Sequence, residues 1–236
     1  MTLTCTPNLD AHRAKLRASF LDWLIEMEPT DVFDLGAGNG ALVAALGERG
    51  VRAAGLEASP ERVAEARALD RPVDRGSAER TGRADGSAGW ATVRHVLHHV
   101  QSPELVLKEA LRIAREGVLI AEPISLTALP MHAANLRLEN ALRALDRARG
   151  MFHAADLSPE RIAALLPADA LVEVRIVAPM TRLPRAEVEY LVERSCGGLP
   201  VDAEGQESLA AALADADAGR LAPSGTAMIA ARLGGR

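Results

Sequence analysis

The sequence predicts an α/β fold in which a largely parallel sheet is covered by helices on both faces. Short apolar segments alternate with amphipathic ones along the chain, and Ser-Pro-Glu triplets at 59–61, 102–104 and 158–160 mark helix starts. In each triplet Ser can cap the helix, Pro suits its first position and Glu meets the positive end of the helix dipole. Strands that alternate with helices in this way form parallel sheets.

Length, charge and composition limit the classes of protein to which the chain can belong. Its 236 residues suit one α/β domain with a cap better than two separate domains. A net charge of −5 and an aromatic content of 3% argue against a nucleic-acid partner, which needs a basic surface and stacking side chains. No apolar run has membrane-spanning length, and residues 1–10 lack the layout of a signal peptide. We therefore expect a cytoplasmic protein that contacts no membrane.

The first predicted elements lead to a glycine-rich turn. A helix is expected over residues 9–28, because apolar residues recur at helical spacing and Pro29 ends the pattern. A strand at 31–35, a glycine-rich turn at 36–40 and a helix at 41–49 follow. The second strand, at 52–56, ends at Glu57. The first helix is expected to pack against the sheet, and its Arg13 and Arg17 are not assigned to the site.

The glycine-rich turn predicts a cofactor-binding loop, because glycine permits a tight turn and the following helix offers unpaired N–H groups. Two cofactor classes compete for it. Residues 36–41 satisfy the Gly/Ala form of the dinucleotide fingerprint, with Glu57 at the distance of a ribose-binding acid. Asp34 favours the other class, since a carboxylate repels a pyrophosphate but attracts the ammonium and sulfonium groups of S-adenosylmethionine.

Two segments resemble the class I S-adenosylmethionine-dependent methyltransferases. Asp34-Leu35-Gly36-Ala37-Gly38-Asn39-Gly40 resembles their first motif. Residues 90–100, a strand that ends in a Leu-His-His turn before Ser102-Pro103 and a helix, resemble the fourth motif of the small-molecule members. The match continues through a helix at 105–114 and a strand at 118–122. The resemblance implies a Rossmann-like, doubly wound, mostly parallel seven-stranded sheet with helical lid or cap insertions.

We expect a single domain, residues 1–236, that is built from four parts. They are an N-terminal helix at 1–30, a cofactor-binding core at 31–122, a lid insertion at 123–157, and a C-terminal core at 158–236 with a helical insertion at about 184–222. The C-terminal part contains a helix at 158–166, a strand at 171–177, helices at 185–194 and 207–218, and a last strand at 226–233. The long segment between the last two strands predicts a second cap element or an oligomer contact, and a homodimer is expected.

The lid insertion contains a predicted helix with an apolar and a charged side. Leucines at 138, 142 and 145 line one side, while Arg143, Arg147 and Glu139 are expected on the solvated side. Because the insertion follows the fifth strand, it should lie above the carboxyl ends of the strands, where α/β sheets bind ligands. The candidate pocket residues there are Met131, His132, Met151, Phe152 and His153, and Tyr190 is a further one in the later insertion.

The resemblance implies S-adenosyl-L-methionine as the cofactor and assigns most of its binding residues to strand ends. These residues are Asp34, Leu35, Gly36, Ala37, Gly38, Gly40, Glu57, Ala58, Ser77, Ala78, Arg94 and His95. The adenine end departs from the family pattern. Ser77 beside Ala78 occupies the position of a common adenine-binding acid, and Gly89-Trp90 stands where an acid often precedes the fourth strand. Asp74 and Asp85 are the alternatives there.

Three histidines lie within five residues, at His95, His98 and His99. No metal is predicted, because no cysteine accompanies them, a third ligand such as Glu122 would have to come from elsewhere, and Cys5 and Cys196 are isolated. His98 or His99 is the candidate catalytic base, since histidine titrates near neutral pH. An equally weighted interpretation is that the pair is structural and supports the turn.

The predicted activity is methyl transfer to an oxygen or nitrogen atom of a small metabolite such as a natural-product intermediate. Positioning and exclusion of water would supply much of the rate. One alternative is a methyltransferase-like protein that catalyses a cyclisation without methyl transfer, or that serves as a binding partner. A further alternative, favoured by the Gly/Ala fingerprint, is an NAD-dependent oxidoreductase.

Overall fold

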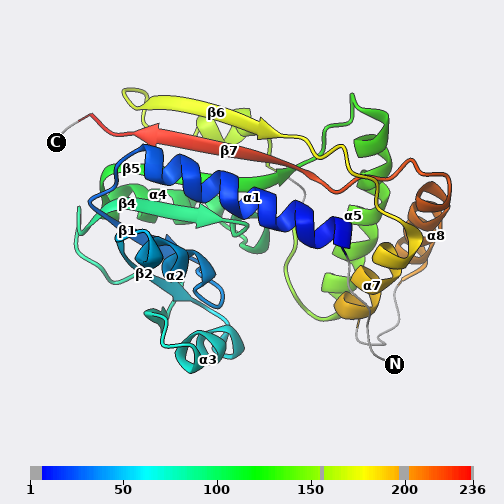
Figure 1. Cartoon of the computed structure of the whole chain (residues 1–236), viewed down its shortest axis with the longest axis horizontal. Coiled ribbons are helices and arrows are strands. Elements are labelled where there is room, and N and C mark those ends of the chain that lie inside the picture. The colour runs from blue at the N-terminus through cyan, green and yellow to red at the C-terminus, as the bar shows by residue number, and fades with distance from the viewer. Residues whose placement is uncertain (1–6, 155–156, 197–201, 235–236) are drawn as a thin grey trace. The chain divides into compact units, whose positions relative to one another are not determined.

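A computed structural model describes residues 7–154, 157–196 and 202–234, and these residues form one seven-stranded mixed sheet with flanking helices. The strand order is β3-β2-β1-β4-β5-β7-β6 (Figure 1). The strands are β1 (Asp31–Leu35), β2 (Arg52–Glu57), β3 (Val73–Arg75), β4 (Ala88–Arg94), β5 (Ala114–Ile124), β6 (Leu171–Val177) and β7 (Gly225–Arg232). This architecture confirms the predicted doubly wound α/β fold.

The helices begin and end close to the predicted positions. They are α1 (Pro7–Glu26), α2 (Ala41–Glu48), α3 (Pro60–Ala68), the 3-10 turn η1 (Leu97–His99), α4 (Pro103–Ile113), α5 (Pro130–Ala148), α6 (Pro159–Ala163), α7 (Arg185–Cys196) and α8 (Ala203–Asp217). Ser59 and Ser158 cap their helices through the side chain, whereas Ser102 does not. Within the described part of the chain, no helix combines the length and the apolarity needed to cross a bilayer.

The described residues divide into two compact units. The first contains segments within Met1–Leu16, Pro123–Asp156 and Ile176–Thr226, and the second contains Arg17–Glu122, Leu157–Arg175 and segments within Ala227–Arg236. The second unit carries most of the sheet. In it β1 pairs in parallel with both β2 and β4, so that Asp34 lies between Gly55 and Thr92. Because β4 also pairs in parallel with β5, the carboxyl ends of these strands share one edge of the sheet.

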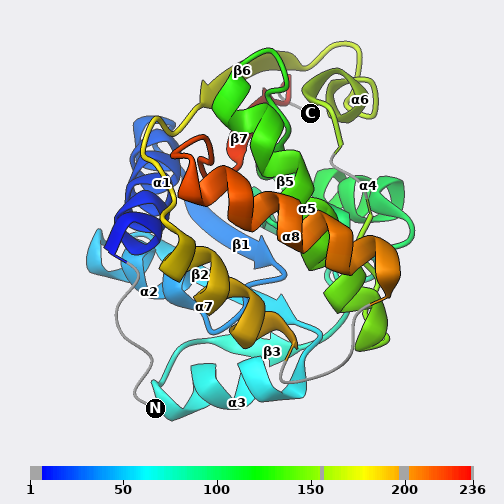
Figure 2. The same ribbon diagram turned by 90° about the vertical axis from the view of Figure 1, so that its right-hand side faces the viewer.

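The first unit contains α5, α7 and α8, which pack around a shared apolar core (Figure 2). Leu138 of α5, Val188 of α7 and Ala212 of α8 are buried in that core. Asp215 of α8 is also buried and pairs with Arg137 and Arg220. The segment between the last two strands thus forms two helices, as predicted, and both pack on α5.

One prediction about α5 is wrong. Arg143 was expected on the solvated side of this helix, but it is buried, and its guanidinium donates a hydrogen bond to Asn140. The buried residues of α5 extend beyond the stripe of leucines and include Ala141, Ala144 and Arg143 itself. Arg147 is exposed as expected.

The candidate pocket residues of the lid segment have different environments. His132 is buried, whereas Met151 and Phe152 are exposed. The Nδ1 atom of His153 lies 2.5 Å from the Oδ2 atom of Asp146. Tyr190 lies on α7 and is half-buried.

Candidate functional site

The glycine loop, residues 36–40, connects the carboxyl end of β1 to α2. Gly36, Gly38 and Gly40 all have positive φ angles, of 75°, 56° and 73°. A Cβ atom at Gly36 would lie 2.4 Å from Cγ2 of Val96, and one at Gly40 would lie 2.8 Å from Cγ2 of Val73. A Cβ atom at Gly38 would meet no atom within 4 Å. Packing therefore requires the outer two glycines, whereas the backbone at Gly38 borders open space that a ligand can occupy.

Replacing Gly38 with alanine is expected to weaken cofactor binding more than it weakens the fold. Gly50→Ala is the matched control, because Gly50 also has a positive φ, 76°, and open space around its Cα. Each substitution should lower the free energy of unfolding by about 1–2 kcal/mol, the cost of a left-handed alanine. Only Gly38→Ala should raise the dissociation constant of S-adenosylhomocysteine, by about tenfold or more, in calorimetry. Equal affinities for the two variants would contradict a ligand position at Gly38.

Asp34 is a buried carboxylate at the end of β1. Burial raises its pKa to about 6, although the charge of Arg94 and a hydrogen bond from Thr92 act in the opposite direction. The Thr92 hydroxyl donates to Oδ1 over 2.6 Å. A buried acid with a raised pKa is stabilised in its charged form by a cationic ligand. The environment of Asp34 therefore fits the ammonium and sulfonium groups that the sequence predicted.

Glu57 ends β2 and holds the glycine loop in place. Its Oε2 accepts a hydrogen bond from the Gly38 N–H over 2.9 Å, and its Oε1 accepts one from the Ser59 N–H over 2.8 Å. The N–H groups of Gly36 and Ala37 donate to the Leu56 carbonyl. Because each carboxylate oxygen has a second lone pair, Glu57 can still accept hydroxyl groups of a ribose. Leu35 and Ala37 are buried in the core, while Ala58 is exposed.

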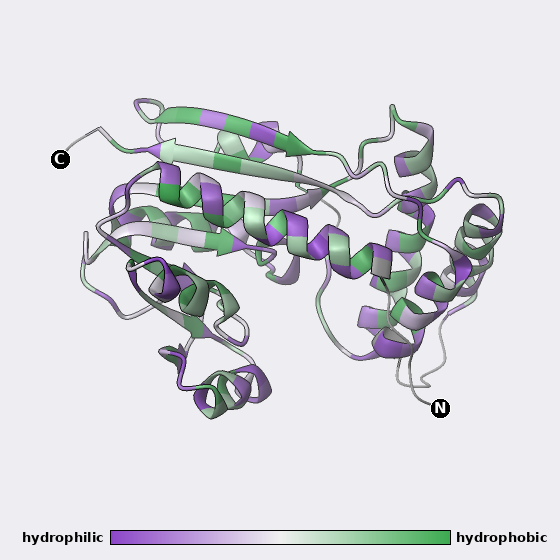
Figure 3. Ribbon diagram, viewed as in Figure 1, coloured by the Kyte–Doolittle hydropathy of each residue, from purple (hydrophilic) through white to green (hydrophobic). Residues whose placement is uncertain are grey.

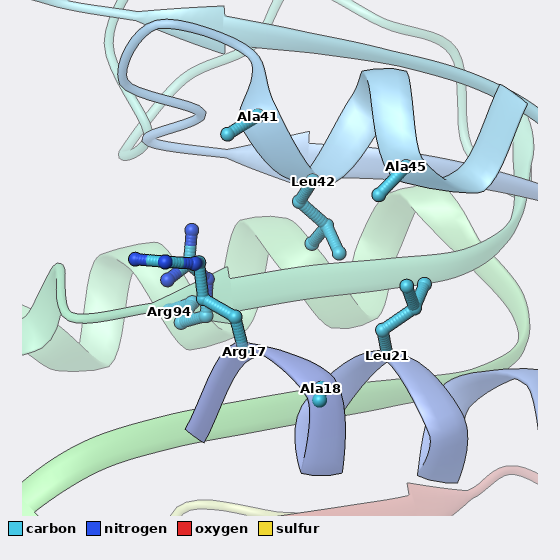
Figure 4. A pocket seen from close by; sticks show the side chains of 7 residues that line it. All are labelled: Arg17, Ala18, Leu21, Ala41, Leu42, Ala45 and Arg94. Atoms are coloured by element: carbon cyan, nitrogen blue, oxygen red, sulfur yellow. The ribbon is translucent and has the colours of Figure 1, made fainter. Parts of the chain in front are cut away.

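A small pocket of about 150 Å³ lies between α1 and α2 (Figure 4). Arg17 of α1 and Arg94 at the end of β4 project into one end of it, and Leu21 and Leu42 face each other beside them. Its lining contains two arginines and no acid, and it borders the first turn of α2. A helix N-terminus with two guanidinium groups favours an anion such as a carboxylate. Arg13 pairs instead with Asp10, at 4.0 Å.

The turn after β4 is organised by Glu122 of β5. One carboxylate oxygen, Oε1, accepts hydrogen bonds from the N–H groups of Val96 and Leu97, both over 2.8 Å. The other, Oε2, lies 2.6 Å from Nδ1 of His98. Burial alone would raise the pKa of Glu122, but the hydrogen bond and charge of His98 outweigh it and the pKa is lowered. The Nδ1 atom therefore carries a proton and His98 is held in one orientation.

The three histidines have different exposures. His98 is buried and its ring centroid lies 4.1 Å from that of His99, which is exposed. His95 has a left-handed backbone, with φ of 56°, and lies before η1 rather than within it. Burial lowers the pKa of His95 to about 4, so that its ring is neutral at physiological pH. The turn thus presents one accessible imidazole, that of His99, next to a fixed one.

The residues predicted to bind the adenine ring of the cofactor are less suited to their role than those of the glycine loop. Ser77 is exposed and its hydroxyl accepts a hydrogen bond from the Glu79 N–H, while Ala78 is buried in the core. Asp74 is exposed on β3. Asp85 pairs with Arg112 and precedes the start of β4, which places it at the amino end of that strand. An adenine ring would bind at the opposite, carboxyl edge of the sheet.

Three residues of the site were either not singled out from the sequence or were given a different role. Thr92 was not singled out, although a hydroxyl within the apolar strand β4 is a signal. Glu122 was considered only as a metal ligand, although it is a buried carboxylate near the carboxyl end of its strand, as Asp34 is. Gly55 of β2 is required because a Cβ there would lie 2.6 Å from the Cβ of Ala37 in the glycine loop.

Comparisons with known proteins give one matching family model and several structures with a similar fold. Residues 33–121 match the family model described as a methyltransferase domain. A comparison with curated protein sequences gives no significant match. Among solved structures, the YcgJ protein from Bacillus subtilis has a TM-score of 0.65 and 17% identity, with 91% of this chain and 98% of that chain covered.

Two further structures share the fold. A SAM-dependent methyltransferase from Archaeoglobus fulgidus has a TM-score of 0.62 and 14% identity, and 94% of each chain is covered. The [4+2]-cyclase SpnF has a TM-score of 0.53 and 19% identity, with 86% of this chain and 75% of that chain covered. Residues 33–121 thus match a methyltransferase domain, and the chain shares the fold of a protein described as a SAM-dependent methyltransferase. Both similarities favour S-adenosylmethionine over a dinucleotide.

Proposed function

We propose that the protein transfers a methyl group to an oxygen or nitrogen atom of a small, partly apolar metabolite, with His99 as the catalytic base. The observation that supports this proposal most is the contrast between the two adjacent histidines. His98 is buried against Glu122, while His99 is exposed on the same turn after β4. The fixed ring supports the turn, and the accessible one can contact an acceptor.

Different binding residues suit different chemical groups of the cofactor. Asp34 suits the cationic groups, Glu57 suits the ribose hydroxyls, and Arg17 with Arg94 suits the carboxylate. When bound, S-adenosylmethionine supplies an electrophilic methyl group. His99 accepts the proton that a hydroxyl or ammonium acceptor must lose, because imidazole is basic near neutral pH. His98 and Glu122 are positioning residues, since they act through the turn rather than on the acceptor.

Methyl transfer from labelled S-adenosylmethionine to a panel of small alcohols, phenols and amines tests this proposal. Labelled product is expected for at least one acceptor. His99→Ala should lower kcat about 100-fold, the usual contribution of a general base. It should lower the melting temperature less than His98→Ala does, and it should leave the affinity for S-adenosylhomocysteine unchanged. His98→Ala should lower the melting temperature, because it removes a buried partner of Glu122. Full turnover by His99→Ala would exclude it as the base without affecting the proposed methyl transfer.

A second candidate is a cyclisation that proceeds without methyl transfer. The sparse adenine end at Ser77 and Ala78 favours it, and SpnF, described as a [4+2]-cyclase, shares the fold. Product that forms at the same rate with S-adenosylhomocysteine in place of S-adenosylmethionine would support this candidate. Product formation that requires S-adenosylmethionine and releases S-adenosylhomocysteine in equal amount would exclude it.

A further inference from the structure

Strand β6 exposes more apolar surface than the rest of the described sheet. The exposed fractions are 74% for Leu171, 39% for Val172, 43% for Val174 and 47% for Ile176. In Figure 3 the strand is green at both ends, with purple between. Large apolar side chains that gather on one surface mark contact sites in proteins that are stable in water. The side chains of β6 therefore suit a partner surface better than they suit water.

The backbone of β6 is also available for pairing. β6 stands at the end of the strand order next to β7, and among residues 7–154, 157–196 and 202–234 no strand pairs with its outer edge. Such an edge presents a row of N–H and C=O groups that can add another strand. Natural sheets protect their edges with charged side chains, proline, bulges or short strands. The seven residues of β6 contain no proline and no lysine, and their two charged residues, Glu173 and Arg175, have opposite signs.

The sequence of β6 is complementary to itself in the antiparallel direction. It reads Leu-Val-Glu-Val-Arg-Ile-Val, so that an acid and a base stand at equal distances from the central Val174. We propose that β6 pairs antiparallel with β6 of a second copy of this chain, about a two-fold axis at Val174. Glu173 then lies opposite the partner's Arg175, and Val172 lies opposite the partner's Ile176. Directly opposite residues have Cβ atoms about 4.5–5.5 Å apart, close enough for both kinds of pair to interact.

Neighbouring registers lack this complementarity. A shift by two residues in one direction places Arg175 opposite the partner's Arg175, and a shift in the other direction places Glu173 opposite the partner's Glu173. A shift by one residue brings Glu173 opposite a valine or an isoleucine and mixes the charged and apolar faces of the strand. Charge and apolar pattern thus select one register, and that register has the closed two-fold symmetry of a dimer.

Arg175 is held where the proposed pairing needs it. Its guanidinium lies over the ring of Trp23, 4.2 Å from the centroid, and Nη1 donates to Glu26 over 3.1 Å. Its Nε atom donates to Glu173 of the same chain over 3.0 Å. The arginine therefore stays along one face of β6, leaving Val172, Val174 and Ile176 together on the other face.

The oligomeric state of the full chain tests the proposal. Sedimentation velocity at micromolar concentration is expected to show a dimer. Val174→Lys places two lysines opposite each other and should raise the dimer dissociation constant by about 100-fold or more. Leu105→Lys is the matched control, because Leu105 is 46% exposed on α4 and should leave the dimer intact. A monomeric wild type, or a dimer that Val174→Lys leaves unchanged, would overturn the proposal.

A pair of charge variants tests the register. Glu173→Arg and Arg175→Glu should each be monomeric alone, because like charges then face each other at both positions. An equimolar mixture should form a heterodimer, since the first variant has two arginines on this face and the second has two glutamates. Retained binding of S-adenosylhomocysteine confirms that each variant is folded. A mixture that stays monomeric while the wild type is dimeric would place the dimer contact elsewhere, and would leave the proposed methyl transfer unaffected.

Discussion

Replacing Asp34 with asparagine is expected to abolish detectable binding of S-adenosylmethionine and to stabilise the unliganded protein. The folded-state pKa of Asp34 is raised from 3.8 to about 6 by burial. The folded state therefore binds the proton more tightly than the unfolded state, and wild-type stability falls as the pH rises between these two values. Above pH 6 the ionised, buried Asp34 lowers the free energy of unfolding by the full amount, about 3 kcal/mol. Asparagine avoids this loss and can still accept the hydrogen bond from Thr92.

Urea denaturation across this pH range checks the prediction. The variant should exceed the wild type in free energy of unfolding near neutral pH, and the difference should vanish near pH 4. Asp74→Asn is the control, because Asp74 is exposed on β3 and its replacement should change neither stability nor binding. A variant that is less stable than the wild type at neutral pH would show that Asp34 supports the fold rather than the ligand.

Replacing Glu122 with alanine is expected to destabilise the protein by about 3–5 kcal/mol. The substitution leaves the N–H groups of Val96 and Leu97 and the ring of His98 without their shared acceptor. Glu122→Gln should cost less, since its carbonyl oxygen can still accept from both N–H groups. Both variants should also lose methyl transfer, because the turn that carries His99 depends on the carboxylate.

Glu122 and Asp34 make contributions to the free energy of unfolding that change with pH in opposite directions. The pKa of Glu122 is lowered from 4.5, so its contribution is complete above that pH and is lost as the pH falls below it. Denaturation curves of the wild type should show this acid loss, and those of Glu122→Ala should lack it. Glu116→Ala, on the same strand but paired with Thr30 near the surface, is the control and should cost little. Equal losses for the two alanine variants would contradict a special role for Glu122.

The parts of the fold that the sequence predicted well are those governed by local pattern. Strand β1 has the predicted bounds because five buried residues in succession are followed by glycines that can adopt positive φ. The starts of α3 and α6 follow from serine caps that act within three residues. Asp34 and Glu57 were found in the same way, because each lies at the end of a strand whose length the sequence reveals.

Other features depend on contacts between distant residues. Thr92 acts on Asp34 only because β1 and β4 pair in one particular register. Glu122 reaches Val96, Leu97 and His98 only because β5 lies beside β4. Arg143 was misplaced because residues around much of α5 are buried, and not only the stripe of leucines. Local periodicity contains no information about such partners.

The two valines beside the glycine loop have a consequence for the kinetics of binding. Val96 packs against Gly36 and Val73 packs against Gly40, so the loop is fixed at both ends before any ligand arrives. The conformational entropy of the loop is therefore lost during folding rather than during binding. A site preorganised in this way needs no slow rearrangement, so diffusion and the opening in front of Gly38 set the association rate of the cofactor.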